Sequence, residues 1–133
     1  MAAEDAVPVG TAARRELGKF GEQVAAAHLV THGFTVLERN WRCRDGEVDI
    51  IAVEGDVLVI CEVKTRRGVG FGTPLDAVTP AKAARLRRLA SRWLADQRAI
   101  DESVRFAEVR FDVVSVLWPA FGRMTVEHLR AAF

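Results

Sequence analysis

The apolar positions near the N-terminus follow the period of a helix. Leu17, Phe20 and Val24 recur at three- and four-residue steps, which places them on one face of a helix over residues 11–32. Gly33 follows directly, and glycine readily adopts the left-handed backbone conformation that ends many helices. The pattern therefore predicts an amphipathic helix that buries one face against the rest of the fold.

A second helix is predicted to begin at Thr79 and Pro80. Threonine caps the unpaired N–H groups of a first turn, and proline suits the first helical position because no N–H is needed there. The helix is expected to continue to about Ala95. Its apolar stripe consists of Leu86, Leu89, Ala90, Trp93 and Leu94. The opposite face has basic residues at three- and four-residue steps, namely Lys82, Arg85, Arg88 and Arg92.

Four runs rich in β-branched and aromatic residues predict strands. The two clearest, residues 48–53 and 57–63, flank a glycine turn and predict a hairpin, and a shorter run precedes them at residues 34–38. A fourth strand is expected at residues 111–117 and a short closing helix at residues 126–133. This order of elements predicts an α/β fold whose central mixed sheet is flanked by helices on both faces.

Length and composition indicate an ordinary globular protein. The chain has 133 residues, of which half are apolar, so it fits one domain. We expect a flexible N-terminal arm at residues 1–10 and a single domain at residues 11–133. The chain has two unpatterned cysteines, no export signal and no apolar run near 20 residues. These features predict a soluble, cytoplasmic protein that does not enter a membrane.

The net charge of +1 conceals a basic segment. Residues 63–95 contain eight basic residues and one acidic residue, so the rest of the chain is acidic. A concentrated basic region suits an anionic partner such as nucleic acid. A solvated helix face has the same pattern, so the charge run alone leaves both interpretations open.

The predicted hairpin brings charged residues together at its open end. A two-residue turn sets a register in which Asp49 lies directly opposite Glu62. The same register places Glu47 opposite Lys64. Glu62 and Lys64 share one face of their strand, because side chains alternate along a strand. The prediction depends on the turn length, since a shift of one residue would change every pair.

Two facing carboxylates beside a buried strand can be stabilised in two ways. A divalent cation removes the repulsion between Asp49 and Glu62, and oxygen ligands suit Mg²⁺ or Mn²⁺. Such a metal activates water and polarises a phosphoryl oxygen, and Lys64 is placed to orient that water or to stabilise charge on the phosphate. Alternatively, Asp49, Glu62 and Lys64 form a buried salt-bridge cluster with a structural role. Spacing alone does not separate these alternatives.

An ordered set of short segments resembles a known family. The segments are Gly18-x-x-Gly21-Glu22, Asn40-Trp41-Arg42, Gly46-Glu47-Val48-Asp49, Glu62-Val63-Lys64-Thr65-Arg66 and Phe71-Gly72. They resemble the bacterial YraN family, also called UPF0102, whose members are described as endonuclease-like. Asp49 with Glu62-Val63-Lys64 also resembles the PD-(D/E)XK nuclease superfamily, which includes restriction endonucleases and Holliday-junction resolvases. The resemblance covers nearly the whole chain.

The resemblance implies a restriction-endonuclease-like α-β-β-β-α-β core and a metal-dependent endonuclease that hydrolyses phosphodiester bonds. The superfamily's metal-binding acids correspond to Asp49 and Glu62, and its catalytic lysine corresponds to Lys64. The first-helix glutamate of resolvase-like members corresponds to Glu22, which would complete the shell of a Mg²⁺ or Mn²⁺ cofactor.

Nucleic acid is the partner implied, with DNA expected ahead of RNA and with structure-selective or non-specific binding. The residues expected to contact phosphates are Arg66, Lys82, Arg85, Arg88 and Arg92. A homodimer would suit symmetric cleavage of two strands. The alternative function is that of a non-catalytic nucleic-acid-binding or adaptor protein that retains the nuclease fold.

Overall fold

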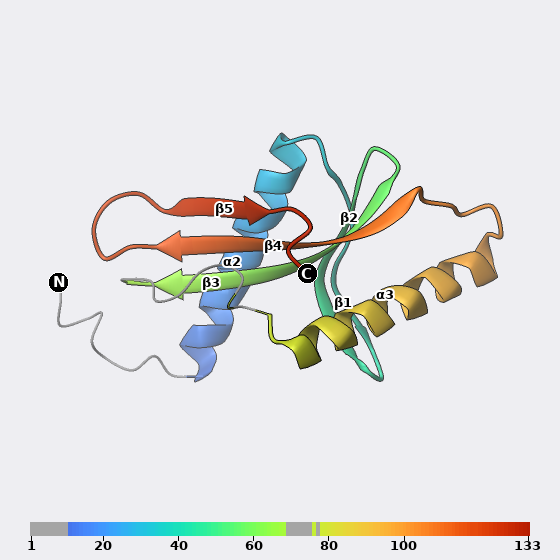
Figure 1. The fold of residues 1–133 in the computed structure, drawn as a ribbon. Coiled ribbons are helices and arrows are strands. Elements are labelled where there is room, and N and C mark those ends of the chain that lie inside the picture. Colours follow the sequence, from blue (N-terminus) through green and yellow to red (C-terminus); the bar gives the residue numbers. More distant parts are fainter. Residues whose placement is uncertain (1–10, 69–75, 77) are drawn as a thin grey trace.

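The computed structural model describes residues 11–68, 76 and 78–133 (Figure 1). Helix α2 spans Thr11–Thr31 and helix α3 spans Pro80–Ile100. The strands are β1 (Thr35–Cys43), β2 (Gly46–Glu54), β3 (Val57–Arg67), β4 (Glu108–Trp118) and β5 (Thr125–Leu129). The expected arm at residues 1–10 and most of the glycine-containing loop after β3 lie outside the described residues.

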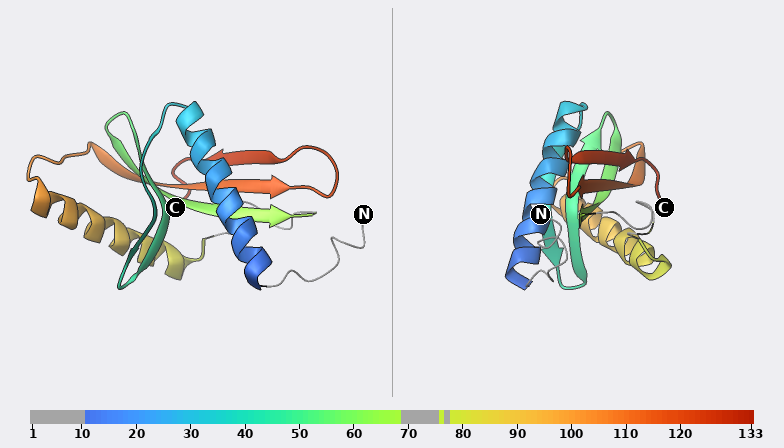
Figure 2. Two further views of the ribbon diagram at one scale, coloured as in Figure 1. Left: turned by 180° about the vertical axis from the view of Figure 1, so that it is seen from behind. Right: turned by 90° about the vertical axis from the view of Figure 1, so that its left-hand side faces the viewer.

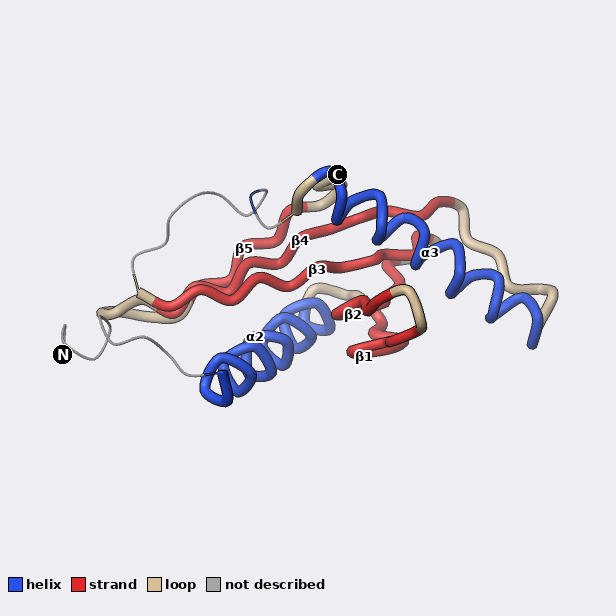
Figure 3. The backbone as a smooth tube through the Cα atoms, turned by 90° about the horizontal axis from the view of Figure 1, so that it is seen from below, coloured by secondary structure: helices blue, strands red, loops and turns tan. Residues whose placement is uncertain are grey.

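One mixed sheet organises the molecule, with the strand order β1-β2-β3-β4-β5. Strands β3 and β4 are parallel, whereas each of the other neighbouring pairs is antiparallel. Parallel neighbours need a crossover connection, and α3 lies within the connection between β3 and β4. Helices α2 and α3 cover opposite faces of the sheet (Figures 2 and 3). The predicted mixed α/β class is therefore confirmed.

Strand β3 is the centre of both apolar layers. Cys61 packs with Leu29 in the layer on the α2 side, whereas Ile60 packs with Leu86 and Leu89 in the layer on the α3 side. All of these side chains are at most 1% exposed. The apolar run at the start of β3 is continuous because residues on both of its faces are buried.

The predicted helix starts and strand positions agree with the structure near α3 and β3. Thr79 caps α3, because its hydroxyl accepts a hydrogen bond from the Lys82 N–H. Helix α3 extends five residues beyond the expected end at Ala95. Each predicted strand is present and longer than expected, because backbone pairing continues past the apolar runs that identify the strands.

The predicted closing helix at residues 126–133 is wrong, because this segment includes most of strand β5. Val126 pairs with Val116 of β4, and His128 pairs with Val114. The segment is short, so local helix preference is weak compared with pairing along the edge of a formed sheet.

Strand β2 turns away from β3 halfway along its length. The pairing runs from Glu54 with Val57 to Ile50 with Cys61, which confirms the predicted hairpin register over these residues. It ends there, although β3 continues to Arg67. Figure 1 shows β1 and the first part of β2 running across the direction of β3, β4 and β5. One edge of the second half of β3 is thereby left without a β2 partner.

None of the helical segments in the described ranges has the combination of length and hydropathy that a membrane-spanning helix requires.

Candidate active site

Asp49 lies at the point where β2 leaves β3. Ile50 is the last β2 residue paired with β3, through Cys61. Immediately before it, the Asp49 side chain takes over the role of a backbone partner: its Oδ2 accepts a 2.8 Å hydrogen bond from the Val63 N–H. The carboxylate is therefore fixed against the open edge of β3 rather than pointing into solvent.

Glu62 faces α3 from the same edge of β3. Side chains alternate along the strand, so Glu62 follows Ile60 onto the α3 face. Its side chain is only 10% exposed, and its Oε1 lies 2.7 Å from the Nζ of Lys82 in the first turn of α3. The cation that pairs with Glu62 is therefore Lys82, and the exposed Lys64 is not its partner.

Burial disfavours the charged forms of both carboxyl groups, and the charge of Asp49 further disfavours the charged form of Glu62. Burial, followed by the charge of Asp49, raises the pKa of Glu62 to about 7, although Lys82 acts in the opposite direction. Burial also raises the pKa of Asp49, while the Val63 hydrogen bond opposes that rise. Asp49 and Glu62 thus form the close carboxylate pair that the sequence predicts, in surroundings that favour a compensating cation.

Helix α2 brings Glu22 to the same region. At Gly21 the helix lies so close to β3 that a Cβ atom there would be 1.8 Å from the Oγ1 of Thr65. Burial and then the negative charge of Asp49 raise the pKa of Glu22, whereas a hydrogen bond with Asn40 lowers it. Asp49 therefore has an acidic neighbour on each side, Glu22 from α2 and Glu62 from β3.

Glu22 borders two cavities beside the carboxylate pair. One, of about 320 Å³, also has Lys64 on its wall and is lined by Leu17, Gly18, Glu22, Val63, Lys64 and Thr65. The other, of about 480 Å³, is lined by Arg15, Gly18, Lys19, Glu22, Asn40, Arg42 and Glu47. Lys64 and Glu22 face a common space, and the larger cavity has three basic residues on its rim.

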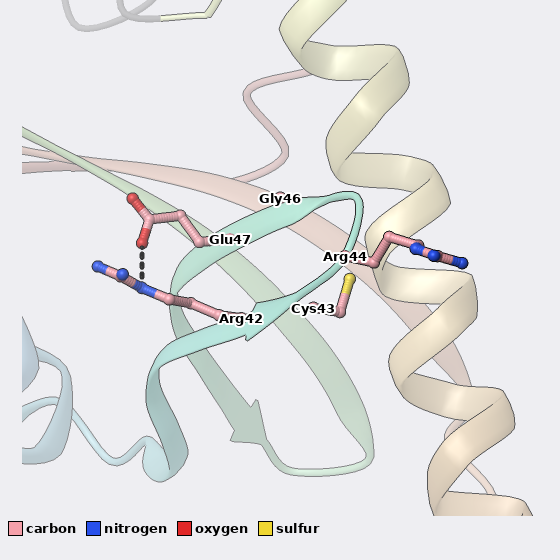
Figure 4. A pocket seen from close by; sticks show the side chains of 5 residues that line it. All are labelled: Arg42, Cys43, Arg44, Gly46 and Glu47. Carbon is pink, nitrogen blue, oxygen red and sulfur yellow. Dashed lines mark ion pairs between the residues drawn. The ribbon is translucent and has the colours of Figure 1, made fainter.

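A third cavity, of about 300 Å³, lies at the hairpin of β1 and β2 (Figure 4). There the Arg42 Nε lies 3.0 Å from Glu47 Oε2, an ion pair across the hairpin. The predicted pairing of Glu47 with Lys64 is therefore wrong. The pairing of β2 with β3 extends only to Ile50, so Glu47, nearer the start of β2, has no partner on β3. Glu47 pairs with Arg42 of β1 instead.

The basic residues of α3 do not form one open surface. Lys82 contacts Glu62, and Arg92 lies within 4.0 Å of both Asp45 and Asp96. Arg85 lies beside Gly46 at the end of the β1–β2 hairpin. Arg88 is exposed, and Arg66 is half-buried on β3. Of the predicted phosphate-contacting residues, Lys82 thus contacts the carboxylate pair, and at least two of them, Lys82 and Arg92, are engaged with acidic side chains.

Asn40 belongs to the site, although the sequence pattern indicates no role for it beyond the Asn40-Trp41-Arg42 segment. Its backbone φ is +52°, in the left-handed region that asparagine tolerates better than most residues. This conformation accompanies a side-chain hydrogen bond with Glu22 on α2. The signal in the sequence is an asparagine inside an apparent strand, next to Trp41 and Arg42.

The donors fit a magnesium or manganese site only in part. Asp49 and Glu62 supply the carboxylate oxygens that these ions prefer, and their repulsion favours a cation. Within the described part of the chain, no group of three or more His, Cys, Asp or Glu side chains is arranged to hold a metal ion. One or two carboxylates, completed by water and a substrate phosphate, are a usual arrangement for Mg²⁺.

Comparison with known proteins identifies relatives along nearly the whole chain. The UPF0102 protein of Acidothermus cellulolyticus is 55% identical over 130 residues, which cover 93% of this chain and 98% of the relative. The UPF0102 protein of Frankia alni is 53% identical over 121 residues, covering 91% of this chain and 97% of the relative. The UPF0102 protein of Streptomyces coelicolor is 55% identical over 119 residues, which cover 89% of this chain and 88% of the relative.

The matched family model has the description "Uncharacterised protein family UPF0102" and spans residues 21–116, from Gly21 on α2 to Val116 on β4. The matched segment includes Glu22, Asp49, Glu62 and Lys64. The chain therefore belongs to the UPF0102 family.

Proposed function

We propose that this protein is a metal-dependent endonuclease with a restriction-endonuclease-like core, acting on nucleic acid in the cytoplasm. The observation that supports it best is the meeting of Asp49 and Glu62 at the open edge of β3, where burial of both carboxyl groups and the charge of Asp49 beside Glu62 favour a cation. Two neighbouring carboxylates are costly to bury beside an apolar strand, whereas a metal-dependent phosphodiester hydrolase uses such carboxylates as metal ligands.

Each residue has a distinct role in this proposal. Asp49 and Glu62 would hold Mg²⁺ or Mn²⁺, which when bound supplies an activated water and polarises a phosphoryl oxygen. Lys64, exposed at the wall of the smaller cavity, donates hydrogen bonds to a phosphate oxygen or to the attacking water. Glu22 faces the same space and adds negative charge beside Asp49.

Basic residues around the cavities support a nucleic-acid substrate. Arg15, Lys19 and Arg42 line the larger cavity, and Arg85 and Arg88 lie on exposed parts of α3. Such contacts position phosphates without distinguishing base sequence. We therefore propose structure-selective or non-specific binding, with DNA preferred to RNA.

A second candidate is a nucleic-acid-binding or adaptor protein without catalytic activity. One observation favours it: the ammonium of Lys82 already compensates the charge of Glu62, so a metal is not needed to neutralise that carboxylate. In that case Asp49 and Glu62 would contribute to the fold, and the basic residues would bind nucleic acid without cleavage.

The test is calorimetric titration of Mn²⁺ into the wild type and into an Asp49→Asn/Glu62→Gln double variant. We expect binding by the wild type and none by the folded double variant, because both ligating carboxylates are then uncharged. Glu54→Gln is the matched control, since Glu54 lies on the same strand but pairs with Arg110 and Arg130 at its other end. It should bind Mn²⁺ as the wild type does.

Cleavage assays on branched DNA, single-stranded DNA and RNA then separate the two candidates. A Lys64→Met variant should retain nucleic-acid binding and lose metal-dependent cleavage. Metal-independent binding by the wild type, with no Mn²⁺ uptake even when an oligonucleotide is present, would reject the enzyme and favour the binding protein.

A further inference from the structure

Lys82 differs from the other basic residues of α3 in its burial and its contact. Its side chain is 32% exposed, and its Nζ lies 2.7 Å from Oε1 of Glu62, whose side chain is 10% exposed. Arg92, nearly three turns further along the same helix, has a side chain 48% exposed and makes ion pairs of 3.4 Å and 3.9 Å. The short contact of Lys82 therefore joins α3 to the carboxylate pair, whereas Arg92 pairs at the surface.

The position of Lys82 is determined by the start of α3. The Thr79 hydroxyl accepts a hydrogen bond from the Lys82 N–H, which fixes the backbone of the first helical turn. Ala83, the next residue, is 7% exposed and so lies against the sheet. The cap holds the backbone of Lys82, and the neighbouring residue is buried. These contacts fix where the Lys82 side chain starts, and from there its ammonium reaches Glu62.

The ion pair has a direct consequence for the charge of the site. When both are ionised, Asp49 and Glu62 place two negative charges at one edge of β3, and the ammonium of Lys82, 2.7 Å from Glu62 Oε1, contributes one positive charge. A divalent ion at the same carboxylates would place its charge beside that ammonium. Like charges at this distance repel, so Lys82 and a metal ion cannot both be close to Glu62 without a loss of free energy.

We propose that Lys82 is the resident counter-cation of Glu62 and competes with a divalent metal ion for this carboxylate. This inference rests on the proposed metal-dependent function. The ammonium leaves Glu62 when a metal ion occupies the site, and its position on the first turn of α3 keeps it beside the open edge of β3. There it pairs with a phosphate oxygen of the substrate, so Lys82 is a positioning residue that links metal binding to substrate binding.

The competition makes a measurable prediction about metal affinity. Mn²⁺ titrations at pH 8, where Glu62 is ionised, should show about tenfold tighter binding by Lys82→Met than by the wild type, because the competing charge is gone. Lys82→Arg should bind Mn²⁺ as weakly as the wild type, because it retains the charge. This conservative variant separates an effect of charge from an effect of side-chain packing.

Arg87→Met is the matched control on the same helix. The Arg87 guanidinium lies over the rings of Phe111 and Phe133, at 5.6 Å and 5.9 Å from their centres. Its removal takes one positive charge from α3 without touching the carboxylate pair. We expect its Mn²⁺ affinity to stay within about twofold of the wild type.

Different results would contradict different parts of the argument. If folded Lys82→Met binds Mn²⁺ no tighter than the wild type, the competition is wrong, and the proposed metal site stands. If neither protein binds Mn²⁺, even when an oligonucleotide is present, both the competition and the metal-dependent function are wrong. If Lys82→Met binds Mn²⁺ and the wild type does not, the competition is supported in its strongest form.

A second titration tests the transfer of the ammonium to phosphate. A phosphorothioate oligonucleotide should tighten Mn²⁺ binding by the wild type, because it provides Lys82 with another partner, and coupling between two ligands is reciprocal. In Lys82→Met this tightening should be several-fold smaller. An equal tightening in both proteins would overturn the transfer to phosphate.

Discussion

The distance between Gly21 and Thr65 determines how closely α2 approaches the candidate site. A Cβ atom at Gly21 would lie 1.8 Å from the Thr65 Oγ1 and 2.9 Å from its Cβ. No rotation of the Thr65 side chain removes the second of these contacts. Glycine therefore allows a close packing of helix on strand that places the adjacent Glu22 beside Asp49.

Gly21→Ala should destabilise the protein by about 1–3 kcal/mol, because the added methyl group forces α2 away from β3. Gly18→Ala is the matched control on the same helix, since a Cβ there meets no atom within 4 Å. This control should be neutral or more stable by up to about 1 kcal/mol, because alanine is the better helix former. Urea unfolding measures both. A Gly21→Ala variant as stable as the control would contradict the close packing.

Pairs fixed by local register could be predicted at the residue scale, and contacts between distant elements could not. Asp49 and Glu62 meet because a short turn sets the hairpin register as far as Ile50 and Cys61. Lys82 reaches Glu62 only because α3 packs over that face of β3, which no local pattern specifies. The predicted pairing of Glu47 with Lys64 is wrong because β2 leaves β3 at Ile50, so the register set by the turn does not extend to Glu47.

At the scale of elements, β5 is the part of the sheet that the sequence did not predict. Its pairing with β4 is reinforced by Asp112, which is fully buried. The Asp112 carboxylate accepts hydrogen bonds from Arg110 at 2.8 and 2.9 Å and from the Ala131 N–H at 3.0 Å, and it lies 2.7 Å from Nε2 of His128 on β5. The contacts of Asp112 with His128 and Ala131 connect residues far apart in the chain, so the local sequence of residues 126–133 does not indicate them.

Asp112→Asn should destabilise the protein by about 3 kcal/mol, because it leaves buried partners of the carboxylate without their counter-charge. The loss should be greatest in β5, where amide hydrogen exchange should become faster than in β3. Glu127→Gln on β5 is the control, since Glu127 is exposed, and it should change stability by less than about 0.5 kcal/mol. Unchanged exchange in β5 of the Asp112→Asn variant would show that backbone pairing alone holds this strand.

At the scale of the whole molecule, the free energy of unfolding depends on pH in opposite directions through two buried carboxyl groups, Asp112 and Glu62. Burial opposes ionisation of Asp112, but hydrogen bonds from Arg110, His128 and Ala131 outweigh it and lower its pKa from 3.8 to about 2. Its contribution is therefore complete above about pH 4 and is lost as the pH falls towards 2. Glu62 has a raised pKa, so its ionised form destabilises the metal-free fold.

The metal-free protein should therefore become more stable as the pH falls from 8 to 5. Burial, followed by the charge of Asp49, raises the pKa of Glu62 from 4.5 in the unfolded chain to about 7 in the fold. On acidification the folded state takes up this proton at a higher pH than the unfolded state does. The stabilisation of the fold by protonated Glu62 is therefore complete below about pH 4.5 and is lost as the pH rises through 7. Relative to Glu62→Gln, which does not titrate, we expect a gain on the order of 2 kcal/mol over this range.

Chemical unfolding of the two proteins at a series of pH values measures this gain. Taking the difference between them removes groups that do not interact with Glu62, including His28, whose pKa is lowered by burial and by the nearby His32 and His128. Mn²⁺ should reverse the trend in the wild type alone, because a cation bound to ionised Glu62 stabilises the fold at pH 8 and is displaced by protons at pH 5. Parallel pH curves for wild type and Glu62→Gln would mean that Glu62 ionises normally in the fold. Ionised Glu62 would then be stable in the fold without a bound cation. The strongest physical support for a metal site on this sheet edge would be lost.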